Sequence, residues 1–185
     1  NEEAIIYIGT GVRSTNMRVA SDEVYFNHLY STYKALYKLK KKIIFKLHYS
    51  RIEAIKELFL DKDLRIDFCE NEDFIDQLES SCGAIVEPST ASLVPAFMGK
   101  HIFLAKYGAL DGLRFGELIN NYPKSISINS YSDFTKIMSL NSNQYNNSAI
   151  EEWIRASVGP LPVGEMPNRV VKTFELAINQ KPKIA

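Results

Sequence analysis

Short apolar runs alternate with amphipathic segments along the first 140 residues of the chain. The segments carry apolar residues at helical spacing, whereas the runs are too short to be helices and are typical of buried strands. Strands separated by single helices need crossover connections, which are right-handed and make neighbouring strands parallel. The pattern therefore predicts an α/β domain with a Rossmann-like, doubly wound parallel sheet that has helices on both faces. Ligands of such sheets bind beyond the carboxyl ends of the strands.

The boundaries of the expected elements follow from this alternation. The expected strands are residues 4–8, 43–47, 64–68, 84–86, 101–104 and 125–128. The expected helices are residues 22–40, 51–60, 74–78, 93–98, 113–119 and 131–139. We expect Ser21, Asn71 and Ser130 to be N-caps, because their side chains can accept a hydrogen bond from a free N–H of the first turn. The apolar face expected for the first helix consists of Phe26, Leu29, Tyr30, Tyr33, Leu36 and Tyr37.

The C-terminal part of the chain differs in composition from this domain, residues 1–140. Residues 141–148 are polar and rich in asparagine, which predicts a linker. Residues 149–185 are expected to form a helical segment that packs on the domain or on a missing N-terminal half. One helical stripe in it consists of Ile150, Trp153, Ile154 and Val158. A last helix is expected from Pro167 to Asn179, because proline is favoured in the first helical turn.

Charge and cysteine content exclude several classes of protein. Lys and Arg together number 22, as do Asp and Glu, so the chain has no general basic field for nucleic acid. Cys69 and Cys82 form neither a disulfide framework nor a zinc cluster, and as small hydrophobes they indicate a reducing, cytoplasmic location. No apolar run is long enough to cross a membrane. The chain begins at Asn1 rather than at a methionine, and we expect it to be one domain of a longer protein.

A glycine-containing turn follows the first expected strand. Gly9-Thr10-Gly11 would let the backbone approach a phosphate closely, and Arg13 lies in the loop behind it as a further anion contact. The third glycine of a dinucleotide fingerprint is missing, so an ordinary strand-to-loop turn remains an equal alternative. Arg13 could likewise be a surface charge.

A turn rich in hydroxyl groups follows the fourth expected strand. Ser89, Thr90 and Ser92 lie where free backbone N–H groups at a helix start favour an anion. N-capping needs only one hydroxyl, so three of them favour phosphate binding over capping alone. Lys106 and Arg114 follow the fifth strand and are expected to face the same crevice, where they could neutralise a diphosphate.

A histidine follows the second expected strand, in the segment Lys46-Leu47-His48. An imidazole beside a helix start can donate a hydrogen bond to a phosphate. The alternative is a histidine that is hydrogen-bonded to the backbone at a strand end, and the residues alone favour that alternative.

A run of lysines closes the first expected helix. Lys38 and the segment Lys40 to Lys42 lie in its last turn and just beyond. Cations suit the negative end of a helix, so we interpret the run as a solvated helix C-terminus rather than as a phosphate-binding patch.

The order of these segments resembles the C-terminal, donor-binding half of GT-B glycosyltransferases. Lys46-Leu47-His48 is similar to the Lys/Arg-x-His-Pro motif of bacterial sialyltransferases, capsule Kdo transferases and CDP-polyol phosphotransferases. Ser89-Thr90 with Ser92 is similar to their Ser-Ser/Thr motif, and residues 96–102 resemble their Ala-x-x-x-Gly-Lys-Pro-Val segment. Tyr49 replaces the motif proline, and Val94 stands where many retaining GT-B enzymes carry a ribose-binding glutamate.

The resemblance implies a function in surface polysaccharide biosynthesis. His48 would be the catalytic group, and together with the hydroxyls of Ser89, Thr90 or Ser92 it would contact the phosphate of a nucleotide-activated sugar. The His-Pro families use cytidine nucleotides, which favours a CMP- or CDP-linked donor. No metal or other cofactor is implied. A missing N-terminal half would bind the acceptor, a glycan or a lipid-linked molecule, and could hold the protein on the inner face of a membrane.

Two alternative functions remain open. The chain could belong to an epimerase of the UDP-N-acetylglucosamine 2-epimerase type, which shares this fold, although Val94 argues against it as well. It could also be a non-catalytic Rossmann-like module for binding or assembly, because half of an active site cannot turn over.

Overall fold

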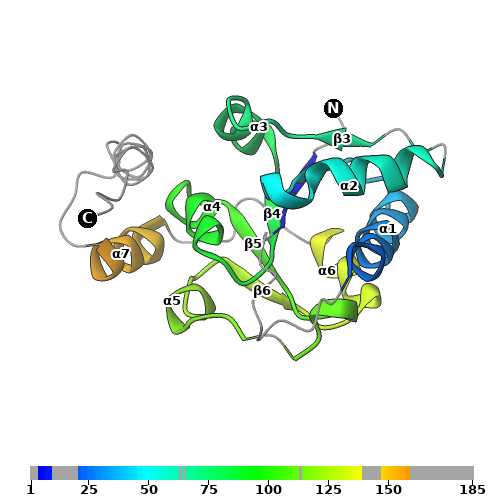
Figure 1. Ribbon diagram of the computed structural model, residues 1–185. Coiled ribbons are helices and arrows are strands. Elements are labelled where there is room, and N and C mark those ends of the chain that lie inside the picture. Colours follow the sequence, from blue (N-terminus) through cyan, green and yellow to red (C-terminus); the bar gives the residue numbers. More distant parts are fainter. Residues whose placement is uncertain are drawn as a thin grey trace, which may run out of the picture.

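The computed structural model describes residues 4–9, 21–62, 64, 66–112, 114–138 and 147–158. Within these residues, a six-stranded parallel sheet has the strand order β3-β2-β1-β4-β5-β6 (Figure 1). The strands are β1 (Ile5–Ile8), β2 (Ile43–Lys46), β3 (Asp67–Phe68), β4 (Gly83–Val86), β5 (His101–Ala105) and β6 (Ser125–Ile128). The predicted α/β, doubly wound fold class is therefore confirmed.

Helices cover both faces of the sheet (Figure 1). The first face carries α1 (Asp22–Lys38), α2 (Tyr49–Leu60), α6 (Thr135–Met138) and the 3-10 turns Gly108–Leu110 and Tyr131–Phe134. The second face carries α3 (Phe74–Ser80), α4 (Leu93–Phe97), α5 (Glu117–Asn120) and α7 (Asn147–Val158). A further 3-10 turn, Thr90–Ser92, leads from β4 into α4.

Burial on both faces explains why the strands are apolar without alternation. In β1, Ile5 and Tyr7 pack under the helices of the first face, and Ile6 and Ile8 pack under those of the second. All four side chains are at most 2% exposed. Parallel sheets that are enclosed by crossover helices need such continuous apolar runs, because no strand face meets water.

Helix α1 begins where it is predicted, and its buried side overlaps the predicted apolar face only in part. The Ser21 hydroxyl accepts a hydrogen bond from the N–H of Val24 at 3.2 Å, which confirms the N-cap. Tyr37, expected on the buried face, is 69% exposed, and that expectation is wrong. Three residues outside the expected apolar face are buried instead, namely Tyr25, His28 and Thr32. Phe26, Leu29 and Leu36 of the expected face are buried as predicted, so the buried side is shifted by less than one residue around the helix axis, by about 70°.

Helix α1 ends in a Schellman motif whose left-handed position carries a lysine. The N–H of Lys40 bonds to the carbonyl of Tyr37 at 2.9 Å, and the N–H of Lys41 bonds to that of Leu36 at 3.1 Å. Lys40 has a φ of 55°, and no other non-glycine residue in the described part of the chain has a positive φ. Glycine is the usual residue here, because a Cβ strains the left-handed conformation.

Replacement of Lys40 by glycine is therefore expected to stabilise the fold. The variant Lys40→Gly should raise the free energy of unfolding by about 1 kcal/mol, because glycine adopts this conformation without the Cβ clash. Urea denaturation measures the change. Lys38→Gly is the matched control, because Lys38 lies in the last helical turn, where glycine should destabilise by up to about 1 kcal/mol. Equal losses of stability in both variants would contradict the expectation.

One predicted N-cap is wrong, and a second has the right position but lacks the expected bond to the backbone. Asp73 holds the N-cap position of α3 without a side-chain bond, and the Asn71 side chain instead accepts a hydrogen bond from the Lys46 ammonium at 2.5 Å. The cation at the end of β2 therefore competes for the oxygen that was expected to cap the helix. Ser130 holds a cap position but bonds to the hydroxyl of Ser132 at 2.7 Å rather than to the backbone.

Helix α7 packs on the second face of the domain. The Trp153 ring lies 4.8 Å from that of Tyr122 and 5.9 Å from that of Phe97, and its indole N–H donates to the carbonyl of Leu118 at 3.1 Å. Ile150 and Ile154 are buried beside it, as their spacing predicts. Residues 141–146 and the helix expected at Pro167 to Asn179 lie outside the described residues. No helix in the described part of the chain has both the length and the apolar character that crossing a bilayer requires.

Candidate functional site

The strand order reverses between β1 and β4, and the residues expected to bind a ligand follow the strands at this reversal. Ile8 at the end of β1 pairs with Lys46 of β2 on one side and with Val86 of β4 on the other. Open α/β sheets bind ligands in the crevice at such a reversal. His48 follows β2 and Ser89 follows β4, so the ends of their strands lie two strand spacings, about 10 Å, apart.

The turn after β4 contains a hydroxyl group without a partner. The Ser89 Oγ is buried and has no hydrogen-bond partner among the described residues. Ser92 is 1% exposed, and its hydroxyl donates to the carbonyl of Ser89, so this side chain closes the turn. Thr90 is exposed beside it. The hydroxyl of Ser89 is thus buried and unpartnered, whereas that of Ser92 braces the turn.

A pocket of about 350 Å³ opens beside this turn. Ser89 and Thr90 line one side of it, and Phe115 and Gly116, which precede α5, line another. The Lys106 ammonium lies 5.7 Å from the centre of the Phe115 ring and 3.4 Å from the Asn120 side-chain oxygen, to which it donates. The pocket therefore brings together residues that follow β4 and β5.

Arg114 directly precedes Phe115 and is exposed. Its place in the chain puts it beside the residues that line the pocket, but no contact shows that its guanidinium reaches them. Its expected part in neutralising a diphosphate therefore remains a prediction.

His48 caps helix α2 through one ring nitrogen. Its Nδ1 accepts a hydrogen bond from the N–H of Ser50 at 3.3 Å, and the Ser50 hydroxyl lies 2.9 Å from the same nitrogen. The backbone contact that the residues alone favoured is therefore present. Because Nδ1 accepts, the neutral ring carries its proton on Nε2, which remains a hydrogen-bond donor. The side chain is exposed at the carboxyl end of β2.

Gly9 is explained by packing inside the domain. A Cβ on this residue would overlap the Tyr25 hydroxyl oxygen and would lie 2.8 Å from a methyl group of Leu47. The glycine is therefore required by the tyrosine beneath it, whatever its part in phosphate binding. The other expected members of this loop, Thr10, Gly11 and Arg13, lie outside the described residues.

A buried polar network lies beneath the reversal. The hydroxyls of Tyr7 and Tyr25 both donate to Oε1 of Glu87, at 2.8 and 2.5 Å. The Tyr7 oxygen also lies 2.9 Å from Nε2 of His28. All four side chains are at most 3% exposed. Glu87 comes directly after β4, so the network fixes the start of the turn that contains Ser89.

Burial sets the protonation states in this network. Desolvation, together with the adjacent Glu87 carboxylate, holds the pKa of both Tyr7 and Tyr25 well above the usual value. The Tyr7 hydroxyl uses its hydrogen in the bond to the Glu87 carboxylate, so the Nε2–H of His28 must donate the second bond, to the tyrosine oxygen. Burial lowers the pKa of His28 to about 4, and the ring is therefore neutral at pH 7.

The network extends along α1 and was not foreseen from the sequence. The Thr32 hydroxyl donates to the carbonyl of His28 and lies 3.0 Å from the hydroxyl of Tyr107. The Arg51 guanidinium lies 4.8 Å over the Tyr25 ring. The one signal was the placement of Tyr25, His28 and Thr32 at i, i+3 and i+7, which puts three polar side chains on a single helix face.

The described residues contain no cluster of metal ligands, and the thiol of Cys69 is buried. Within the residues that the structure describes, no three His, Cys, Asp or Glu side chains are grouped so that they could hold a metal ion. Both cysteines are free thiols. Cys69 is fully buried, and burial raises the pKa of its thiol to about 11.

Comparison with known proteins identifies the fold but no sequence family. No protein-family model and no curated protein matches the chain. The wall teichoic acid polymerase TagF matches with a TM-score of 0.56 at 17% identity, over 99% of this chain and 46% of that one. The UDP-GlcNAc 2-epimerase of Methanocaldococcus jannaschii, in complex with UDP-GlcNAc and UDP, matches with a TM-score of 0.50 at 15% identity, over 84% and 45%. A TagF variant soaked with CDP-glycerol matches with a TM-score of 0.50 at 16% identity, over 98% and 44%.

These likenesses concern one half of larger molecules. The chain spans about half the length of the solved structures that it matches. Its fold is that of one Rossmann-like half of a GT-B-like protein such as TagF.

Proposed function

We propose that this chain is the donor-binding half of a GT-B-like transferase that uses a nucleotide-activated donor. The unpartnered hydroxyl of Ser89 carries the proposal, because a buried polar group without a partner destabilises by about 1–3 kcal/mol unless a ligand satisfies it. Ser89 lines a pocket next to the strand reversal, between the residues that follow β4 and those that follow β5, and α/β sheets bind nucleotides at this end of their strands. The likeness to a TagF variant soaked with CDP-glycerol supports a cytidine-linked donor, in surface polysaccharide biosynthesis.

The donor phosphate would lie across the end of β1. In this arrangement Ser89 and Thr90 donate to it from the β4 side, and the Nε2–H of His48 donates from the β2 side. Negative charge grows on the departing phosphate during transfer, and fixed donors stabilise that charge in the transition state. Lys106 and Arg114 would add positive charge at the same edge. The nucleoside would occupy the pocket beside Phe115 and Gly116.

A second half would complete the enzyme. We infer that it binds the acceptor, a glycan or a lipid-linked molecule, and that the segment 149–185 lies between the two halves beyond the linker 141–148. Helix α7, at the start of this segment, packs on the domain through Trp153, which supports a position of the segment against this half.

Calorimetric titration with CMP, CDP and UDP tests the proposal. We expect a cytidine nucleotide to bind the wild-type chain, and we expect Ser89→Ala to weaken binding about tenfold, the effect of one lost hydrogen bond of about 1.4 kcal/mol to a charged group. His48→Asn should weaken binding by a similar factor, because asparagine keeps the helix cap but lacks the Nε2 donor.

Ser80→Ala is the matched control. Its hydroxyl donates to the carbonyl of Gln77 at the end of α3, which leads into the amino-terminal end of β4, so affinity should not change. Failure of all three nucleotides to bind at millimolar concentration would overturn the proposal. Binding of UDP alone would favour the epimerase-like alternative.

A further inference from the structure

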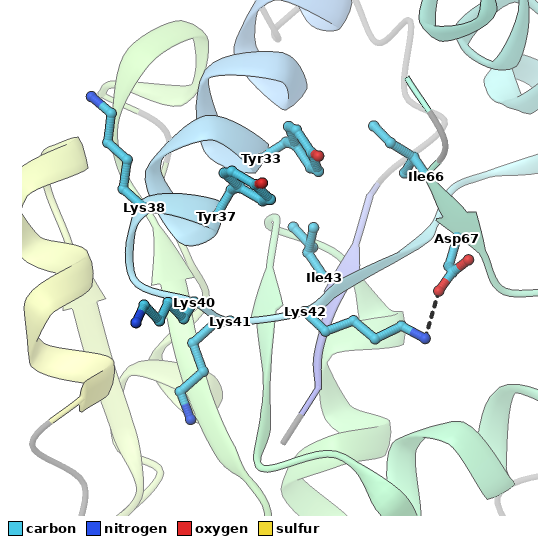
Figure 2. A pocket seen from close by; sticks show the side chains of 9 residues that line it. All are labelled: Tyr33, Tyr37, Lys38, Lys40, Lys41, Lys42, Ile43, Ile66 and Asp67. Atoms are coloured by element: carbon cyan, nitrogen blue, oxygen red, sulfur yellow. Dashed lines mark ion pairs between the residues drawn. The ribbon is translucent and has the colours of Figure 1, made fainter. Parts of the chain in front are cut away.

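A large pocket lies at the opposite edge of the sheet from the candidate donor site. Its volume is about 670 Å³, and it opens where α1 ends and β2 begins, at the amino-terminal ends of the strands (Figure 2). Its lining includes Tyr33, Tyr37, Lys38, Lys40, Lys41 and Lys42, which we name the lysine pocket. The reversal that holds His48 and Ser89 lies at the carboxyl ends, so the two sites are separate.

The charge of the lysine pocket is unbalanced. Four lysines line it against a single carboxylate, that of Asp67, which pairs with Lys42 at 2.6 Å. Lys38, Lys40 and Lys42 are exposed. The chain as a whole has a formal net charge of zero, so this excess of positive charge is a local feature. The negative end of the α1 dipole is worth about half a charge and offsets only a small part of it.

Lys40 contributes its charge from a strained backbone position. Its left-handed conformation suits glycine, and no ion pair or hydrogen bond of its side chain is recorded within the described residues. A residue that breaks a local rule without a compensating contact points to a role outside the fold. The ammonium of Lys40 is therefore better explained by an external anion than by the solvated helix end expected from the sequence.

The lysines do not converge on one small anion. Figure 2 shows the side chains of Lys38, Lys40 and Lys41 pointing away from one another, while Lys42 reaches toward Asp67. A site for a single phosphate would aim its cations at one point. Diverging cations instead fit an extended surface of many negative charges.

A pair of aromatic rings, one of them exposed, adjoins these cations. The rings of Tyr33 and Tyr37 stack with centres 5.8 Å apart, and Tyr37 is 69% exposed. Tyrosine has an apolar ring and a polar tip, which suits the level of lipid headgroups in a bilayer. Lysines beside such rings are typical of contact with an anionic lipid surface.

We propose that the lysine pocket docks this chain on an anionic lipid bilayer. Each lysine near such a surface strengthens binding by about fivefold, and the contributions of several lysines to the binding free energy add up. Docking at the amino-terminal edge of the strands leaves the edge with His48 and Ser89 turned away from the bilayer and open to soluble nucleotides. The inference does not depend on the proposed transferase function.

Co-sedimentation with vesicles tests the proposal. We expect the wild-type chain to bind vesicles of phosphatidylcholine with phosphatidylserine, not vesicles of phosphatidylcholine alone, and to be released by high salt. A triple variant with Lys38→Glu, Lys40→Glu and Lys41→Glu should bind at least about a hundredfold more weakly. The single variant Lys40→Glu should also bind more weakly, and Lys106→Glu, which makes the same charge change at the opposite edge of the sheet, is its matched control and should retain binding.

A glycine variant separates binding from stability. Lys40→Gly should bind these vesicles about fivefold more weakly although it raises the thermal midpoint, a combination that damage to the fold cannot produce. Lack of wild-type binding to the anionic vesicles, or unchanged binding by Lys40→Gly, would overturn the proposal. Calorimetric binding of inorganic phosphate that requires Lys40 would also overturn it, because the site would then serve a soluble anion.

Discussion

Acidification is expected to destabilise the fold through His28, by about 3 kcal/mol once the pH has fallen to 4. Burial lowers the pKa of this histidine in the folded chain from 6.5 to about 4. Between these values the unfolded chain binds a proton that the folded chain does not, so unfolding becomes more favourable as the pH falls. The contribution of neutral His28 to the free energy of unfolding is therefore present in full above its unfolded pKa of 6.5, and it is lost progressively as the pH falls to about 4.

Urea denaturation of matched variants isolates this contribution. Between pH 7.5 and pH 5 the wild type should lose about 2 kcal/mol through His28, and His28→Gln should lack that loss whatever its stability at the higher pH. Thr32→Val is the control, because it disturbs the same network without removing a titratable group and should keep the wild-type pH dependence. An identical pH dependence in His28→Gln and the wild type would show that the ring is not buried in its neutral form.

The variant Gly9→Ala is expected to lose about 3 kcal/mol of unfolding free energy. The new methyl group would overlap the Tyr25 hydroxyl, which cannot move away freely because it donates to Glu87 at 2.5 Å and is 1% exposed. Overpacking of a dense core and loss of a hydrogen bond to a carboxylate both contribute to the expected loss. Chemical denaturation at neutral pH measures it.

A double-mutant cycle identifies the cause of this loss. Tyr25→Phe removes the oxygen that the methyl group overlaps, so Gly9→Ala should be less harmful by at least about 1 kcal/mol in that background. Gly116→Ala should be nearly neutral, because a Cβ at that position meets no atom within 4 Å. Additive effects of Gly9→Ala and Tyr25→Phe would mean that Leu47, not the tyrosine, resists the substitution.

The sheet could be predicted because its strands depend on local composition. A run such as Ile5-Ile6-Tyr7-Ile8 is short and wholly apolar, and only a strand buried on both faces fits it. The turn after β4 was located for a similar reason, because its hydroxyls are adjacent in the sequence. Which of these segments become neighbours depends on the order of the strands in the sheet, and the spacing of residues in the sequence does not specify that order.

The buried network could not be predicted because its members are far apart in the chain. Tyr25 and Glu87 are separated by 62 positions, and nothing near either residue in the sequence announces the other. Polar residues on a helix are normally assigned to the solvent side, so Tyr25, His28 and Thr32 were left out of the apolar face. Their hydrogen bonds extend the buried side of α1 beyond the face that hydrophobic spacing indicates.

The central position of β1 affects the order in which the chain can fold during synthesis. This strand pairs with β2 and β4, and the described elements α1, β2, α2, β3 and α3 are made before β4 follows it out of the ribosome. Until then its apolar side chains lack one of their two neighbours, and contacts between such distant segments form slowly. During elongation the nascent domain therefore exposes an apolar strand that becomes fully enclosed only after β4 has been made.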